Sequence, residues 1–135
     1  MINEQYEQSE LTGRIIGCAM KVHREIGCGF PEVVYQRCLE IEMGAADLAF
    51  RREVTMPLFY KGIEVGSRRV DFLVDDLVPV ELKAVAAITD AHIAQTLNYL
   101  TAYQLRVALL INFGESSLVF KRLVNSRIPA PLRPQ

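Results

Sequence analysis

The sequence predicts a single α/β domain in which a mixed β-sheet is flanked by helices. Three observations predict this class. Two segments of helical periodicity come first, three strand-like segments joined by short turns follow, and a further helix separates these from two last strands. A start rich in hairpins followed by a helical crossover gives both antiparallel and parallel neighbours. The 135 residues, 50% of them hydrophobic, suffice for one core, which we expect at about residues 9–124 between tails at 1–8 and 125–135.

Two helices are predicted before the first strand. The first runs from about Ser9 to Ile26, because apolar residues recur there at helical spacing. Ser9 is its expected N-cap, and Gly27 is expected to end it because glycine readily adopts a left-handed cap. The second begins at Pro31, a residue favoured in the first turn, and runs to about Met43, with Gly44 as its stop.

Alternation of apolar and polar residues then predicts three strands. They are Phe50 to Tyr60, Ile63 to Val74 and Leu77 to Val85, with turns at Lys61–Gly62 and Asp75–Asp76. Pro79 has no N–H to donate, so it must lie at the start of its strand or against a sheet edge. A hairpin followed by a third antiparallel strand is the expected arrangement.

The remaining elements are a helix and two strands. Asp90 is expected to cap a helix at about Ala91 to Tyr103, since apolar residues recur there at helical spacing. Leu105 to Ile111 is an almost continuous apolar run, which is typical of a buried strand. Phe113–Gly114 forms a turn, and Leu118 to Val124 is the last strand.

Charge and composition exclude some classes of function. The net charge is −1, whereas a protein that binds nucleic acid non-specifically is often strongly basic. Some basic residues are nevertheless grouped. The pairs Arg51–Arg52 and Arg68–Arg69 are candidates for an anion-binding face. No apolar stretch approaches 18 residues, so no signal peptide and no membrane partner are expected. Three cysteines without a CxxC motif indicate a reduced, cytoplasmic protein.

The most informative residues for chemistry are Asp71, Glu81 and Lys83. Asp71 lies on the second strand, while Glu81 and Lys83 are two apart on the third and so share a face. Carboxylate oxygens suit Mg²⁺ or Mn²⁺, and such an ion polarises a phosphodiester. A solvated strand end is the plainer explanation of a Glu-x-Lys pair. However, the strand of Glu81 is otherwise apolar, and a buried charge needs partners.

Two further groups of residues have both a structural and a functional interpretation. Glu32 either complements the dipole of its helix or faces the carboxylates as an extra metal or water ligand, whereas Tyr35 taken alone is a core aromatic. Gln95 and Tyr99, with His92 one turn earlier, share a helix face. That face is either simply solvated, or it overhangs the carboxylates and touches a substrate phosphate.

Taken together, these residues resemble the PD-(D/E)XK nuclease superfamily and, within it, the GxxExxY protein family. The similarity covers about residues 11 to 124 and includes several motifs in the family's order. The matching segments are GFPEVVY at 29–35, VHREIG at 22–27, RVDFLV at 69–74, VELKA at 80–84, QTLNY at 95–99 and LINFG at 110–114.

The resemblance implies that residues 1–135 form one PD-(D/E)XK nuclease-like domain with a restriction-endonuclease-like core. It implies that Asp71, Glu81 and the backbone carbonyl of Leu82 hold Mg²⁺ or Mn²⁺, with Glu32 as a further candidate ligand. It implies that Lys83 assists the attacking water. The other residues to which it gives a role are Gln95, as an accessory catalytic residue, and Tyr99, Tyr35 and His92, as substrate contacts.

The expected function is therefore a metal-dependent nuclease that hydrolyses phosphodiester bonds, in DNA rather than RNA. The alternative is a non-catalytic or partner-activated module that binds nucleic acid or protein on the same fold. A homodimer or a larger complex is compatible with either interpretation. Fold alone does not decide between them, because function depends on the site.

Overall fold

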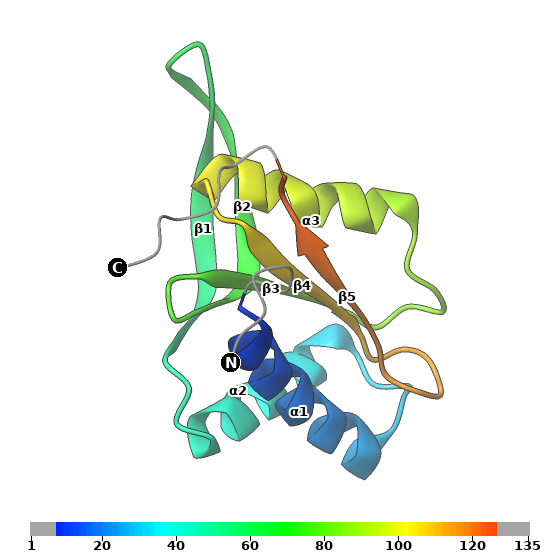
Figure 1. Ribbon diagram of the computed structural model, residues 1–135. Coiled ribbons are helices and arrows are strands. Elements are labelled where there is room, and N and C mark those ends of the chain that lie inside the picture. The colour runs from blue at the N-terminus through cyan, green and yellow to red at the C-terminus, as the bar shows by residue number, and fades with distance from the viewer. Residues whose placement is uncertain (1–7, 127–135) are drawn as a thin grey trace.

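The computed structural model describes residues 8–126 and confirms the predicted order of helices and strands, ααβββαββ (Figure 1). Nearly all of the two predicted tails therefore lies outside the described residues. The elements are α1 (Ser9–Ile26), α2 (Glu32–Ala45), β1 (Phe50–Tyr60), β2 (Ile63–Val74), β3 (Val78–Lys83), α3 (Asp90–Tyr103), β4 (Val107–Asn112) and β5 (Val119–Val124). None of the helices within residues 8–126 has both the length and the apolar character needed to cross a bilayer.

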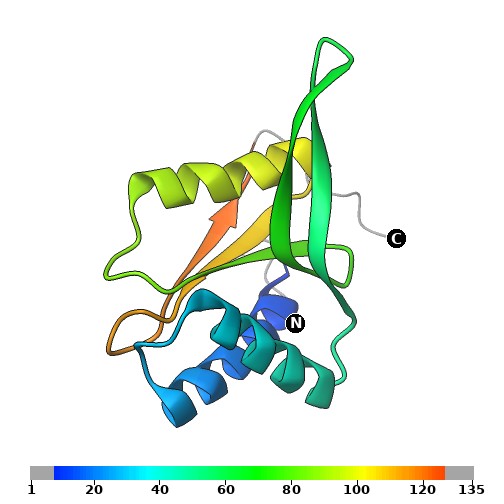
Figure 2. The ribbon, with the colours of Figure 1, turned by 180° about the vertical axis from the view of Figure 1, so that it is seen from behind.

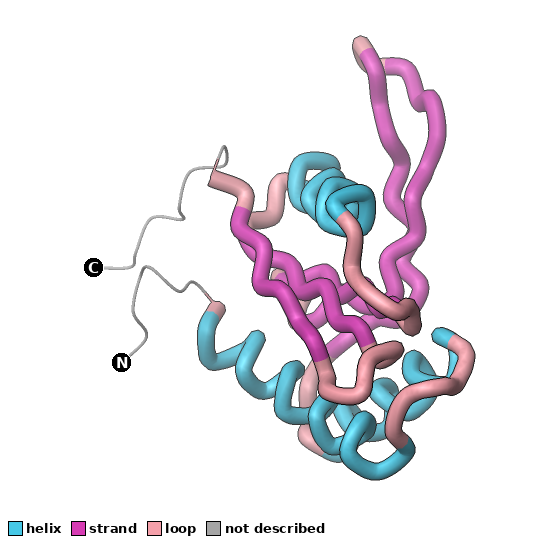
Figure 3. Tube along the Cα trace, turned by 90° about the vertical axis from the view of Figure 1, so that its right-hand side faces the viewer, coloured by secondary structure: helices cyan, strands magenta, loops and turns pink. Residues whose placement is uncertain are grey.

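The five strands form one mixed sheet in the order β1-β2-β3-β4-β5. β3 and β4 are parallel and are connected through α3, while every other neighbouring pair is antiparallel. Pro79 is the second residue of β3, so it lies at the start of its strand, as expected. α1 and α2 lie on one side of the sheet and α3 lies on the other (Figure 3).

The main core lies between the sheet and the α1–α2 pair. Ile15 of α1 and Leu39 of α2 are fully buried there against Phe72, Leu82 and Ile111 of the three central strands. The apolar residues of α1 repeat at helical spacing, and those of β2 and β3 alternate, so each element presents one apolar face to this core. The core thereby holds the first turn of α2 close to the ends of β2 and β3.

The β1–β2 hairpin extends far beyond the rest of the sheet (Figures 1 and 2). β1 pairs with β2 from Phe50↔Val74 to Tyr60↔Ile63, whereas β3 pairs with β2 only from residue 72 to residue 74. We call residues 54–70 of this hairpin the ribbon. A small cluster of Met56, Val70 and Tyr99 packs its base against α3. Lys61 and Gly62 both have positive φ at the tip, as a tight two-residue hairpin turn requires.

Three predicted helix boundaries were wrong. Gln8, not Ser9, is the N-cap of α1. Thr89, not Asp90, caps α3: its Oγ1 accepts the His92 N–H at 3.3 Å, and its own N–H donates to His92 Nδ1 at 3.0 Å. Gly44 lies inside α2 rather than ending it. In each case the predicted residue lies within one or two positions of the observed helix end. Its capping preference alone does not fix the exact boundary, which also depends on how the helix packs.

Candidate active site

The candidate site lies where β2 separates from β3. Their pairing stops at Phe72↔Val80, so Asp71 is the first residue of β2 beyond the paired stretch. Its side chain replaces the missing ladder contact, because Oδ2 accepts the backbone N–H of Leu82 at 2.8 Å. A carboxylate bonded to a main-chain donor on a buried strand is held in one orientation.

Gln36 of α2 holds the other oxygen of Asp71. Its Nε2 donates to Asp71 Oδ1 at 3.0 Å, and the residue is only 5% exposed. Gln36 was not among the predicted site residues. The signal that could have found it is its spacing, since it follows Glu32 by four residues and therefore shares a helix face with it.

Glu81 is buried beside Asp71. Burial is the main cause that raises the pKa of the Glu81 carboxyl to about 9, and the hydrogen bond and charge of Asp71 raise it further. The hydroxyl of Tyr99 and the charge of Lys83 act in the opposite direction. Two carboxyl groups this close, one of them buried, do not readily both ionise unless a cation accompanies them. The chemistry of this donor pair therefore suits a divalent cation.

Glu32 and Lys83 complete the charged group. Burial raises the pKa of Glu32, and so does the charge of Asp71, while Lys83 lowers it. Glu32 is the first residue of α2 and stands at the rim of a pocket of about 240 Å³. The lining residues of this pocket are Glu32, Val33, Gln36, Glu53, Arg69 and Asp71. Glu53 was not among the predicted residues.

α3 contributes Tyr99 to the site. Its hydroxyl donates to the Arg69 carbonyl at 2.9 Å, and burial together with the charge of Glu81 raises the pKa of Tyr99. The guanidinium of Arg68 lies 5.8 Å from the Tyr99 ring centroid. The Gln95 side chain lies one turn earlier and hydrogen-bonds to no other residue within 8–126.

A family model described as the PD-(D/E)XK nuclease superfamily matches residues 9–123 of this sequence. The chain belongs to this superfamily. Its members are in general hydrolytic nucleases that usually use Mg²⁺ or Mn²⁺. No curated protein matches the chain.

The crystal structure of SSO0001 has a fold similar to that of this PD-(D/E)XK domain, with a TM-score of 0.55 and 16% sequence identity. The match covers 89% of this chain and 60% of that chain, so the PD-(D/E)XK domain spans less than two thirds of the length of SSO0001. At this identity the comparison shows a common fold and nothing further.

Two predicted substrate contacts have structural roles in this PD-(D/E)XK domain. Tyr35 is fully buried and stacks on Phe113 at 4.6 Å between ring centroids. Its hydroxyl donates to the Gly27 carbonyl at 2.6 Å, so it supports the turn that leads into α2 and cannot reach a substrate at the surface. His92 belongs to the cap of α3, where its Nδ1 is already bonded to the Thr89 N–H.

The donor set of the PD-(D/E)XK site fits a metal ion only with help from other ligands. No group of three or more His, Cys, Asp or Glu side chains within residues 8–126 is arranged so that it could hold one. Asp71 and Glu81 supply two carboxylates, and the backbone of Leu82 is adjacent. Divalent magnesium commonly takes one or two carboxylates and keeps several waters, so this pair suffices as its side-chain anchor.

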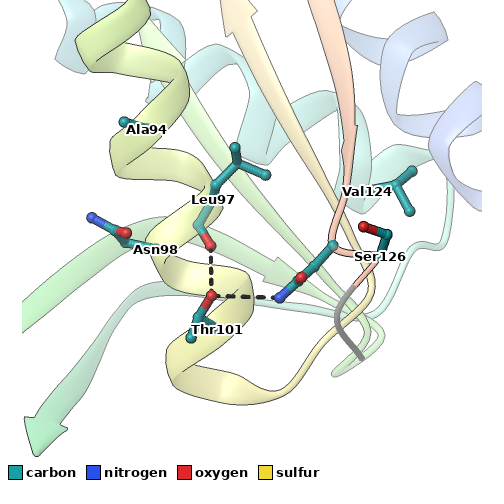
Figure 4. A pocket seen from close by; sticks show the side chains of 7 residues that line it. Ala94, Leu97, Asn98, Thr101, Val124 and Ser126 are labelled. Atoms are coloured by element: carbon teal, nitrogen blue, oxygen red, sulfur yellow. Dashed lines mark hydrogen bonds between the residues drawn. The ribbon is translucent and has the colours of Figure 1, made fainter. Parts of the chain in front are cut away.

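A larger pocket of about 340 Å³ lies elsewhere in the PD-(D/E)XK domain, between α3 and the end of β5 (Figure 4). Asn125 Nδ2 donates to Thr101 Oγ1 across it at 3.4 Å. Its lining residues are Ala94, Leu97, Asn98, Thr101, Val124, Asn125 and Ser126. It contains no ionisable side chain and shares no residue with the pocket at Asp71, so it lacks the groups for acid–base or metal chemistry.

Proposed function

We propose that this chain is a metal-dependent nuclease that hydrolyses phosphodiester bonds of DNA in preference to RNA. The observation that carries the proposal is the buried Glu81 beside the partly buried Asp71, with Lys83 close to both. The preference for DNA, and membership of the GxxExxY family, are supported by the motif resemblance. A cytoplasmic location is part of the proposal and is supported by three free cysteines, Cys18, Cys28 and Cys38.

In the proposed mechanism, Asp71, Glu81 and the Leu82 carbonyl would hold Mg²⁺ or Mn²⁺. The bound ion supplies charge that polarises the phosphodiester and lowers the pKa of water. Lys83 orients the attacking water and offsets the negative charge that develops on the phosphate. Glu32, at the pocket rim, accepts a hydrogen bond from the same water or acts as a further ligand.

The remaining residues position these groups. Gln36 and the Leu82 N–H fix the two oxygens of Asp71, and Tyr99 lies against Glu81. Gln95 is proposed to contact the substrate from the same face of α3 as Tyr99. Hydrogen bonds from neighbouring residues that fix the orientation of the functional groups are typical of preorganised sites.

Lys83→Ala is expected to lower cleavage by about 10²- to 10³-fold, because it removes the positive charge closest to the reacting phosphate. The measurement is cleavage of mixed single- and double-stranded DNA and RNA in Mg²⁺, in Mn²⁺ or in EDTA. Lys21→Ala is the matched control, since this lysine is exposed on α1 and forms an ion pair with Glu42 at 3.7 Å. Equal cleavage by Lys83→Ala and the wild type would contradict the proposal.

Gln36→Leu is expected to raise the Mg²⁺ concentration needed for half-maximal cleavage by about tenfold, because Asp71 loses the donor that orients one oxygen. Cleavage at saturating Mg²⁺ should largely recover, which a simple loss of folding would not produce. Arg37→Leu, on the exposed neighbouring position, is the control. An unchanged Mg²⁺ dependence in Gln36→Leu would show that this hydrogen bond does not position Asp71.

The second candidate function is a non-catalytic or partner-activated binding module. The observation that favours it is that no three metal-binding side chains converge within residues 8–126. Nucleic-acid binding that is unaffected by EDTA, with no cleavage of any substrate, would decide for this alternative. Cleavage that begins only when a second protein is added would identify partner activation.

A further inference from the structure

The tip of the ribbon exposes large apolar side chains that nothing within residues 8–126 covers. Phe59 and Tyr60 on β1 are 63% and 64% exposed, and Ile63 and Val65 on β2 are 68% and 65% exposed. A monomeric protein rarely leaves such side chains together in solvent without a use for them. The ribbon also projects away from the sheet in every view (Figures 1, 2 and 3).

The ribbon has two different faces. Met56 and Val70 lie on the face that packs against Tyr99 of α3. Because side chains alternate along a strand, the pairs Thr55↔Arg69 and Pro57↔Ser67 lie on the opposite face, and so does Phe59. We call this opposite face the open face. Arg69 also lines the pocket at Asp71, so the open face leads from the candidate site toward the tip.

Charge indicates which partner fits the open face and the tip. Residues 54–70 contain Lys61, Arg68 and Arg69 but only one acid, Glu64, which gives a net charge of +2 in a chain of net charge −1. Arg68 is opposite Met56 and lies over Tyr99 on the packed face, so Lys61 and Arg69 are the cations of the tip and the open face. Arg69 lies 3.9 Å from Glu53, yet its side chain stays 64% exposed. Such an exposed ion pair is weak and leaves the guanidinium available to a phosphate.

Aromatic rings beside cations are the usual means of binding unpaired bases, because every base has a π-face that can stack. Phe59 lies on the open face, and Tyr60, the next residue, lies at the tip on the other face. The Lys61 ammonium lies 5.4 Å from the Tyr60 ring centroid. The net positive charge of the ribbon complements the phosphates of a nucleic-acid strand. We propose that the ribbon binds the unpaired bases of a nucleic-acid strand whose scissile phosphate lies at Asp71. This inference rests on the proposed function.

The length of the ribbon sets the length of strand that it would follow. Each strand residue advances about 3.3 Å, so Phe59 lies roughly 20 Å from the level of Asp71. That distance corresponds to roughly six stacked nucleotides at about 3.4 Å each. The preferred substrate therefore has a single-stranded stretch of about six nucleotides or more beside the scissile phosphate.

The test measures binding in EDTA, so that cleavage does not interfere. Fluorescein-labelled DNA duplexes carry a blunt end, an overhang of about two thymidines or an overhang of about twelve, and fluorescence anisotropy gives each Kd. The wild type should bind the long overhang about tenfold more tightly than the blunt duplex. Phe59→Ser and Tyr60→Ser should each lose this preference. Ile41→Ser, at an equally exposed position on α2, should retain it.

A second measurement observes the stacking itself. The chain contains no tryptophan, so Phe59→Trp introduces a single fluorescent reporter at the tip. Addition of the long overhang should quench its emission, and the blunt duplex should not. Because tryptophan keeps an aromatic face, this variant should also retain the preference that Phe59→Ser loses. Tight binding without quenching would overturn the inference.

The outcomes separate this inference from the proposed function. If cleavage requires metal and Lys83 but the tip variants bind every duplex as the wild type does, only the role of the ribbon is wrong. If the chain binds no nucleic acid at all, both proposals fail. If the wild type sediments as a dimer and Phe59→Ser sediments as a monomer with unchanged DNA binding, the tip is an interface between two copies, which overturns the inference.

Discussion

Glu81→Gln is expected to abolish metal-dependent cleavage and, in EDTA, to make the protein more stable at neutral pH. The amide removes one of two proposed carboxylate ligands, so no detectable cleavage should remain. The same change removes an ionisable group whose pKa is raised from 4.5 to about 9 by burial and by Asp71. The variant should thus lose cleavage but gain stability. A general disturbance of the fold would reduce both.

The stability effect depends on pH in a defined direction. Below about pH 4.5 the Glu81 carboxyl is protonated in the folded and in the unfolded chain, so it contributes no difference. As the pH rises toward about 9, the unfolded chain ionises while the folded chain keeps its proton, and the free energy of unfolding falls. Glutamine does not titrate, so Glu81→Gln should gain on the order of 1–3 kcal/mol over the wild type near neutral pH.

Thermal unfolding in EDTA near pH 5 and near pH 8 measures this difference. The melting temperatures of the two proteins should be close at the lower pH, and that of Glu81→Gln should be higher at the upper pH. Mg²⁺ should raise the melting temperature of the wild type but not of the variant, since only the wild type binds it. Glu25→Gln, on an exposed part of α1, is the control. Identical melting temperatures at both pH values would show that Glu81 is not buried beside Asp71.

Gly114→Ala is expected to cost about 3 kcal/mol or more of stability. A Cβ at this position would overlap the backbone of Val85 and lie 2.7 Å from the carbonyl carbon of Ala84. Backbone atoms cannot rotate away as a flexible side chain can, so the whole segment after Lys83 would have to move. Urea unfolding measures the loss. Gly17→Ala is a control of the same chemistry in an open part of α1, where alanine should stabilise the helix by about 0.5–1 kcal/mol.

The close approach at Gly114 belongs to a network centred on Asn112, which is fully buried. Asn112 Oδ1 accepts the N–H groups of Val85 and Gly114, both at 3.0 Å, and its Nδ2 donates to the Val85 carbonyl at 2.9 Å. This network holds the chain that leaves β3 immediately after Lys83. Gly114→Ala should therefore also reduce cleavage in the fraction that remains folded. Wild-type stability in Gly114→Ala would mean that the two segments lie further apart.

Most of the fold could be predicted because its elements have regular periodicity. The alternation from Phe50 to Val74 and the turn at Lys61–Gly62 predicted the long hairpin with its correct bounds. The projection of the ribbon could not be predicted, because alternation predicts a strand but not the length over which the next strand pairs with it.

The end of α2 was predicted too early for a different reason. A glycine in an exposed helix position costs only about 1 kcal/mol, so Gly44 does not have to end the helix.

The site was predictable where its residues lie on neighbouring strands. The spacing of Asp71 and Glu81 predicted that they lie close together, and the structure places them in contact. Gln36 and Glu53 were missed because neither was singled out by a motif, although Glu53 lies on the strand next to that of Asp71. Tyr35 was given a substrate role by its motif, but only its burial against Phe113 shows that it supports the turn before α2. The chemical roles of all the site residues stay predictions, namely those of Asp71, Glu81, Leu82, Glu32, Lys83, Gln95 and Tyr99.

The position of β1 at the end of the sheet has a consequence for solubility. An outer strand of eleven residues presents a row of backbone groups on which another chain can add, as in aggregation. Two residues interrupt this row. Pro57 has no N–H, and Glu53 has a φ of 56°, which turns the backbone out of the extended form. Both residues therefore limit the addition of another chain along the outer edge of β1.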